Sequence, residues 1–185
     1  MDPRTHRTQR GFNLLEVVVS LAILGTLLGA AVPDVVDMVQ ASRLSNVSND
    51  VLQQLQLARS EAIKRNGRVA LCKSADGEWC SETGGWEQGW ILFQDANNSG
   101  AREATEPMLQ RLLPIPAGYR LAANAPLARY VSYGPMGGAR MTSNAFQAGT
   151  FTVCRISADP VEGHQIIVNA SGRPRLHKLQ LADCM

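Results

Sequence analysis

The chain has 185 residues, of which 45% are hydrophobic and 18% charged, with four cysteines and a formal net charge of +2. The length suits one N-terminal membrane segment followed by one globular domain with a single core. The surplus positive charge lies in the first 11 residues, and beyond them 15 basic residues balance 15 acidic ones. This balance excludes recognition by overall charge, so any electrostatic recognition must come from local patches.

The N-terminus combines a basic flank with a long apolar run. Three arginines precede residues 12–32, which contain a single charged side chain. As a helix this run would be about 30 Å long, enough to cross the hydrocarbon core of a bilayer. We therefore predict a single-pass membrane helix, with the arginines in the cytoplasm and everything beyond residue 32 on the other side of the membrane. The small residues at 29–31 imitate a signal-peptidase site, so a cleaved secretory signal is an alternative.

Glu16 is the one charge in the apolar run, where a carboxylate needs a partner. Gly11, Phe12 and Glu16 behind a basic leader resemble the class III signal of type IV pilins and pseudopilins. The resemblance implies that prepilin peptidase cuts after Gly11 and that the new N-terminus at Phe12 is methylated. It also implies that Glu16 is buried between filament subunits, where the first amine of a neighbouring subunit can pair with it. The alternative is a carboxylate that reaches water from near the helix end.

A second helical pattern follows the apolar run. Asn66 and Gly67 predict its end, with Lys64 and Arg65 in the last turn. Six apolar residues at spacings of three and four should lie on one side of this helix: Leu44, Val47, Val51, Leu55, Ala58 and Ala62. The predicted segments are a leader at 1–11, a membrane or filament-core helix at 12–32, its amphipathic half at 33–67 and a globular domain at 68–185.

From residue 68 onward the pattern changes to short runs of β-branched and aromatic residues, bounded by Gly, Pro, Asn or Asp. Because no second long helical pattern separates these runs, they should form one antiparallel sheet or two packed sheets against the helix. The predicted fold class is therefore α+β. Strands are predicted at 68–72, 89–93, 130–133, 150–154 and 165–168, with two more at 108–113 and 119–122.

Several phrases resemble the GspH/FimT group of minor pilins and minor pseudopilins, and they occur in the group's order. They are LQLARSEAIKRNGRVALC from residue 55, WEQGWILFQDANNSG from residue 86, GTFTVC from residue 149 and SGRPR from residue 171. The resemblance implies a minor pilin that works at a pilus tip, outside the cell, with prepilin peptidase and other major and minor pilins as partners. The alternatives are a minor pseudopilin of type II secretion and a pilus-assembly subunit that binds no DNA.

The four cysteines, Cys72, Cys80, Cys154 and Cys184, all lie on the side predicted to be translocated. An even number in an oxidising compartment favours disulfides, and four cysteines allow three connectivities. From translocation and loop length we expect Cys72 to pair with Cys80, and Cys154 with Cys184. Zinc is the alternative, but no C-x-x-C pair or His cluster supports it.

Residues 95–106 suggest a second kind of metal site, one for calcium. Asp95, Asn97 and Ser99, with Glu103 and Glu106 at the ninth and twelfth places, match the register of a calcium loop. Asn, Ser and Gly are also ordinary turn residues, and a strand rather than a helix precedes them, so a hairpin loop is the default. No motif marks a catalytic nucleophile, and we expect no enzyme activity, cofactor or metal.

Near the C-terminus, Ser171 and Gly172 predict a turn that Pro174 stiffens, so that Arg173 and Arg175 should project from one exposed loop. In FimT-like proteins of competent bacteria the matching GRxR motif is the DNA-binding element. The resemblance therefore implies weak, sequence-independent binding of double-stranded DNA, in support of natural transformation. The alternative is a solvated hairpin end that serves subunit packing.

Three further cations could extend this patch. Lys178 follows the motif directly. Arg140 and Arg155 belong to a stretch, residues 107–158, that has five arginines and no acid. They would contribute if the fold brings them near the motif.

Overall fold

One long helix, α1, runs from Leu14 to Arg65 in the computed structural model, which describes residue 11 and residues 13–184, without the side chains of residues 27, 28, 30–34 and 37. Asn66 takes a left-handed φ of 47°, and the Gly67 N–H donates to the Ala62 carbonyl at 3.1 Å. This bond satisfies a carbonyl that the last turn would leave open, so the predicted helix end is confirmed.

The chain divides into two compact units, one ending at Ala41 and one running from Ser42 to Met185. In the first unit large apolar side chains face solvent, such as Leu14 at 80% and Leu21 at 62% exposure. Among the described residues, no helix has both the length and the apolarity needed to cross a membrane. Phe12 and several side chains of the expected membrane helix at 12–32 lie outside the described residues.

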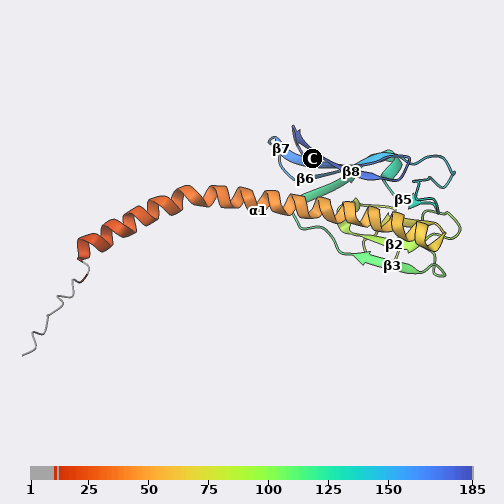
Figure 1. Ribbon diagram of the computed structural model, residues 1–185, viewed down its shortest axis with the longest axis horizontal. Coiled ribbons are helices and arrows are strands. Elements are labelled where there is room, and N and C mark those ends of the chain that lie inside the picture. The colour runs from red at the N-terminus through yellow and green to blue at the C-terminus, as the bar shows by residue number, and fades with distance from the viewer. Residues whose placement is uncertain (1–10, 12, 185) are drawn as a thin grey trace, which may run out of the picture. The chain divides into compact units, whose positions relative to one another are not determined.

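The second unit contains two four-stranded antiparallel sheets (Figure 1). Two single-turn 3-10 helices, η1 (Trp86–Gln88) and η2 (Ala125–Leu127), lie in the connections. The first sheet has the order β3 (Met108–Leu112), β2 (Trp90–Gln94), β1 (Val69–Lys73) and β5 (Tyr130–Tyr133). The second has the order β4 (Tyr119–Ala123), β6 (Gly149–Arg155), β7 (Val161–Val168) and β8 (Pro174–Leu181).

The core forms where α1 meets the inner faces of both sheets. All six residues of the predicted apolar stripe, from Leu44 to Ala62, are buried. They share one cluster with side chains of the first sheet, such as Leu92, and of the second, such as Phe151 and Ile166. Neither sheet nor helix could bury its apolar face alone, so the helix and the two sheets share one core. The predicted α+β class is confirmed.

All seven predicted strands are present, within a few residues of their expected bounds. The eighth strand, β8, was not predicted, and it changes the expected basic loop. Pro174 begins β8 at a place where a proline is tolerated, on the first residue of an edge strand. The structure therefore places Arg175 and Lys178 on a strand, opposite Ile167 and His164, and leaves Arg173 in the turn.

Candidate functional site

The turn between β7 and β8 carries the predicted basic motif, and Asn169 organises it. Its side-chain Oδ1 accepts hydrogen bonds from the Ser171 hydroxyl at 2.7 Å and from the Arg173 N–H at 3.1 Å. Its carbonyl accepts from the Gly172 N–H at 2.8 Å. Bonds from an Asn side chain to nearby groups of the backbone stabilise turns. The turn therefore has a fixed conformation, with Arg173 exposed at its end.

This turn packs tightly against the loop that follows β5. A Cβ on Gly172 would lie 2.1 Å from the Gly137 carbonyl oxygen and 3.1 Å from the Ala139 backbone nitrogen. Gly172 also has a φ of +74°, which side chains disfavour. The same Gly137 carbonyl accepts a hydrogen bond from Nε of Arg59, on α1, at 3.0 Å. Three separate segments of the chain thus meet at one carbonyl.

A groove of 480 Å³ lies between α1 and the start of β8. Its lining contains three arginines and no carboxylate. Three permanent positive charges around one groove suit an anion. The sequence analysis did not select Arg59, because on its own it is one more polar residue of an amphipathic helix. The lining consists of Gln56, Arg59, Ser60 and Ile63 from α1, with Arg173, Pro174 and Arg175.

Tyr133, the last residue of β5, lies beneath the turn. Its Cε1 is 3.0 Å from the position of a Cβ on Gly172, and its side chain is fully buried. The hydroxyl has no hydrogen-bond partner among the described residues. Burial raises the pKa of this hydroxyl, and the positive charge of Arg59 opposes that shift. The turn therefore rests on a neutral aromatic side chain, with the Arg59 charge close by.

The other predicted cations are not gathered at the groove. Arg140 follows the loop that contacts the turn, but its guanidinium stacks on Phe146 at 4.1 Å and lines a different groove. Lys178 lies 3.5 Å from the Glu162 carboxylate, which offsets its charge. Arg155 is five residues along β6 from Thr150, which pairs with Ile167 beside Arg175. This separation is about 17 Å along the strand.

Both expected disulfides are present, and no cysteine among the described residues is free. Cys72 pairs with Cys80, and Cys154 with Cys184. The second bond ties the end of the chain to β6, and an isolated bridge between Ser157 and Cys184 continues this contact. The Cys154–Cys184 disulfide lies in a small apolar cluster on the outer side of the second sheet, next to Val161.

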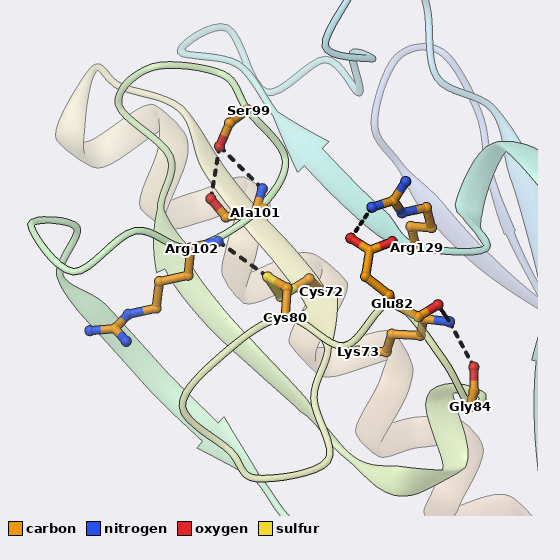
Figure 2. A network of polar contacts seen from close by, with 9 residues as sticks. All are labelled: Cys72, Lys73, Cys80, Glu82, Gly84, Ser99, Ala101, Arg102 and Arg129. Atoms are coloured by element: carbon orange, nitrogen blue, oxygen red, sulfur yellow. Dashed lines mark hydrogen bonds and ion pairs between the residues drawn. A yellow bond between two sulfur atoms is a disulfide. The ribbon is translucent and has the colours of Figure 1, made fainter.

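Hydrogen bonds of Lys73 and Arg102 surround the first disulfide (Figure 2). Nζ of Lys73 donates to the carbonyls of Glu82 and Gly84 at 3.2 and 2.7 Å. The backbone N–H of Arg102 donates to Sγ of Cys80 at 3.2 Å. The Arg102 bond connects the disulfide loop to residues 95–106, and the Lys73 bonds connect it to residues 82–84.

The suspected calcium loop directs its carboxylates at its own backbone. Asp95 accepts hydrogen bonds from the N–H groups of Ser99 and Gly100, at 2.9 and 3.1 Å. Glu106 accepts from those of Ala96 and Glu103, at 2.8 and 3.0 Å. Burial raises the pKa of Asp95 in spite of these bonds. Within the described part of the chain, no three His, Cys, Asp or Glu side chains are grouped to hold a metal ion.

A buried polar contact that the sequence analysis missed joins α1 to the second sheet. The Ser48 hydroxyl donates to the Leu44 carbonyl at 2.7 Å and also forms a hydrogen bond of 2.9 Å with Nδ1 of His164, on β7. Nε2 of His164 lies 3.3 Å from the Glu162 carboxylate. The hydrogen bond with His164 lowers the pKa of Glu162 against an opposing effect of burial, and Lys178 adds to the lowering. Ser48 and His164 are both buried, so this contact joins α1 to β7 inside the core.

Comparison with known families shows which family has this sequence pattern. Residues 47–172 match the model of the family described as type II transport protein GspH. The chain belongs to the GspH family. Residues 6–32 of this GspH-family chain also match the prokaryotic N-terminal methylation motif. Its family and fold are those of type IV pilins and pseudopilins, which are structural subunits.

Individual relatives agree with the family. The pilin-like protein PilA1 of Thermus thermophilus is 36% identical over 92 residues, which cover 49% of this chain and 51% of the relative. The chain thus spans about half the length of this curated relative. The type IV minor pilin FimU of Pseudomonas aeruginosa PAO1 matches in two crystal forms, with TM-scores of 0.60 and 0.54 and identities of 18% and 16%. These matches cover 80% and 77% of this chain and 99% and 100% of FimU, and they show a shared fold.

The residues expected to direct processing of this GspH-family chain lie at its N-terminus. Gly11 is exposed, and Phe12 lies outside the described residues. Glu16 is in the first turn of α1, where a negative charge favours the helix, and its side chain is exposed. Its expected contact with a neighbouring subunit stays a prediction.

Proposed function

We propose that this chain is a minor type IV pilin. Prepilin peptidase cuts between Gly11 and Phe12, the new amine is methylated, and α1 is held in the inner membrane until the subunit enters the filament with Glu16 between packed helices. The methylation motif over residues 6–32 supports this route. The exposed apolar side chains of the first unit support the same route, because an apolar surface of this kind marks a contact with lipid or with another protein.

Intact-mass measurement of the chain purified from its native membrane tests the processing step. The expected mass is that of a chain beginning at Phe12 with one added methyl group. An uncut chain, or one cut after Ala31, contradicts the proposal. Gly11→Ala should leave the chain uncut, while Gly29→Ala, in the imitated signal-peptidase site, should not change the mass at the N-terminus.

We further propose that the subunit binds double-stranded DNA without regard to sequence, through the turn that carries Gly172 and Arg173 and the start of β8 with Arg175. The observation that carries this proposal is the groove lined by three arginines and no carboxylate. A guanidinium group can bind two phosphate oxygens at once. Contacts to the DNA backbone alone do not distinguish one base sequence from another. Such binding is weak and falls steeply with salt.

Anisotropy titration of the full-length chain in a non-ionic detergent with two unrelated DNA duplexes tests this function. The double variant Arg173→Ala/Arg175→Ala should weaken binding of both duplexes alike and lower the salt slope by about two, one for each lost phosphate contact. The control is Arg120→Ala/Arg155→Ala, which removes the same charge from the opposite end of the second sheet. Binding that is absent at low salt, or equal in both double variants, refutes the DNA function.

A second candidate is a minor pseudopilin of type II secretion, because the matching family model is described as a type II transport protein. Deletion of the gene separates the two. Loss of pili or of transformation with normal export of secreted enzymes supports the pilin, and the reverse pattern supports the pseudopilin.

A further inference from the structure

Arg59 is placed in the arginine-lined groove more firmly than Arg173 or Arg175. It is half-buried on α1, and its Nε is engaged by the Gly137 carbonyl at 3.0 Å. Its two terminal nitrogens have no hydrogen-bond partner among the described residues. The side chain is therefore fixed at one end, while its remaining donors are unused. A guanidinium held in this way loses little conformational freedom when it binds an anion.

Arg173 and Arg175 complete the surroundings from the opposite side. Both are exposed, and neither side chain forms an ion pair within the described part of the chain. Asn169 fixes the backbone of the turn through its bond to the Arg173 N–H. The close approach of Gly172 to Gly137 brings this turn against the carbonyl that holds Arg59. One carbonyl thus links the positions of the helix cation and the turn cations.

We propose that this groove binds one phosphate of a nucleic-acid backbone at Arg59, while Arg173 and Arg175, on its outer side, bind the neighbouring phosphates of the strand. The inference rests on the proposed DNA function and adds a contact that does not belong to the sequence motif. Because Arg59 is half-buried, its charge is screened less than that of a cation on an open surface. A diester is favoured over an isolated anion, because the exposed arginines beside the groove can follow the neighbouring phosphates of the strand.

The test is an anisotropy titration of the full-length chain in detergent with double-stranded DNA over a range of salt concentrations. Arg59→Gln should weaken binding about tenfold at low salt, the size of one charge-assisted hydrogen-bonding contact. It should also lower the salt slope by about one. Arg43→Gln is the matched control, since Arg43 is an exposed arginine of the same helix about 24 Å away. That variant should bind like wild type.

The salt slope separates a phosphate contact from a merely structural role. If Arg59→Gln only released the loop after β5, affinity would fall with an unchanged slope, and this result would overturn the proposal. An effect equal to that of Arg43→Gln would overturn it as well. Arg59→Lys covers the case in which the glutamine variant does not fold. It should keep the slope and lose affinity severalfold, because one ammonium cannot serve both Gly137 and the phosphate, and full affinity would contradict the proposal.

The outcomes also separate this inference from the DNA function. If Arg173→Ala/Arg175→Ala abolishes binding while Arg59→Gln does not weaken it, the phosphate contact of Arg59 falls and the DNA function stands. If the wild-type chain binds no DNA, both fall. Equal binding of poly-glutamate at the same salt would assign the groove to protein carboxylates and refute the nucleic-acid ligand.

Discussion

The carbonyl oxygen of Gly137 lies 2.1 Å from the point that a Cβ on Gly172 would occupy. The glycine of the basic motif is therefore required by its neighbour, and not only by its own φ of +74°. The arginine beside it can reach the groove only because the turn and the loop after β5 touch without intervening side chains. Motif and loop thus act as one unit.

Gly172→Ala should destabilise the domain by about 2–4 kcal/mol, because it adds a backbone clash to the strain of a left-handed residue. Gly118→Ala is the matched control, since Gly118 has a φ of +87° but nothing within 4 Å of its Cβ position. It should cost about 1–2 kcal/mol from strain alone. Urea unfolding of both variants measures the difference. Equal losses would mean that the contact with Gly137 does not constrain the turn.

Ser48→Ala should destabilise the protein by about 1–3 kcal/mol, because it leaves Nδ1 of buried His164 without its hydrogen-bond partner. Ser60→Ala is the control, because its hydroxyl also donates to a carbonyl of α1, that of Leu57, but is exposed. The control should change stability by no more than about 0.5 kcal/mol. Thermal unfolding compares the two. A small effect of both substitutions would show that the contact between Ser48 and His164 does not contribute to stability.

The Glu162 carboxylate should make stability fall on acidification. Its pKa is lowered from 4.5 in the folded chain, chiefly by the hydrogen bond with His164. Its contribution is therefore complete above the unfolded value and is lost as the pH falls through the folded value. Glu162→Gln removes this dependence, so the gap in stability between wild type and variant should narrow below pH 4.5. Urea unfolding at several pH values measures this difference in stability. A difference that widens below pH 4.5 would refute the effect assigned to Glu162.

The two disulfides should differ in their effect on stability. Cys154 and Cys184 are 30 residues apart and Cys72 and Cys80 only 8, so the chain-entropy model gives about 3.5 and 2.5 kcal/mol. Paired serine substitutions, one pair at a time, test this by urea unfolding under oxidising conditions. Should the short loop prove the larger contributor, the bonds of Lys73 and Arg102 that accompany it would have to account for the excess.

Much of the fold could be predicted because it depends on local periodicity. The spacing from Leu44 to Ala62 gives the buried side of α1 directly, and Asn66 with Gly67 gives its end. β8 was missed because Pro174 and the basic residues after it conceal an edge strand, whose pairing with β7 supplies order that composition does not. Pairing with the preceding strand decided the structure of this segment.

The candidate site divides in the same way. The basic motif at 172–175 is visible in sequence, and so is the pairing of the cysteines. Arg59 is not, since only tertiary packing brings a helix residue beside a turn near the other end of the chain. The resemblance of residues 95–106 to a calcium loop has a second explanation, for a related reason. Asp95 and Glu106 bond to backbone N–H groups of their own loop, and spacing cannot tell this use from metal ligation.

The disulfide between Cys154 and Cys184 encloses β7, the basic turn and β8 in a covalent ring. Ser171 and Arg173 of the turn are exposed, as are residues 158–160 nearer the start of the ring, and a protease has access to both segments. A single nick in either segment would open the ring into two ends without releasing a fragment, because the disulfide still joins both pieces. β8 would stay paired with β7, and the two arginines would remain tethered to the subunit after the cut.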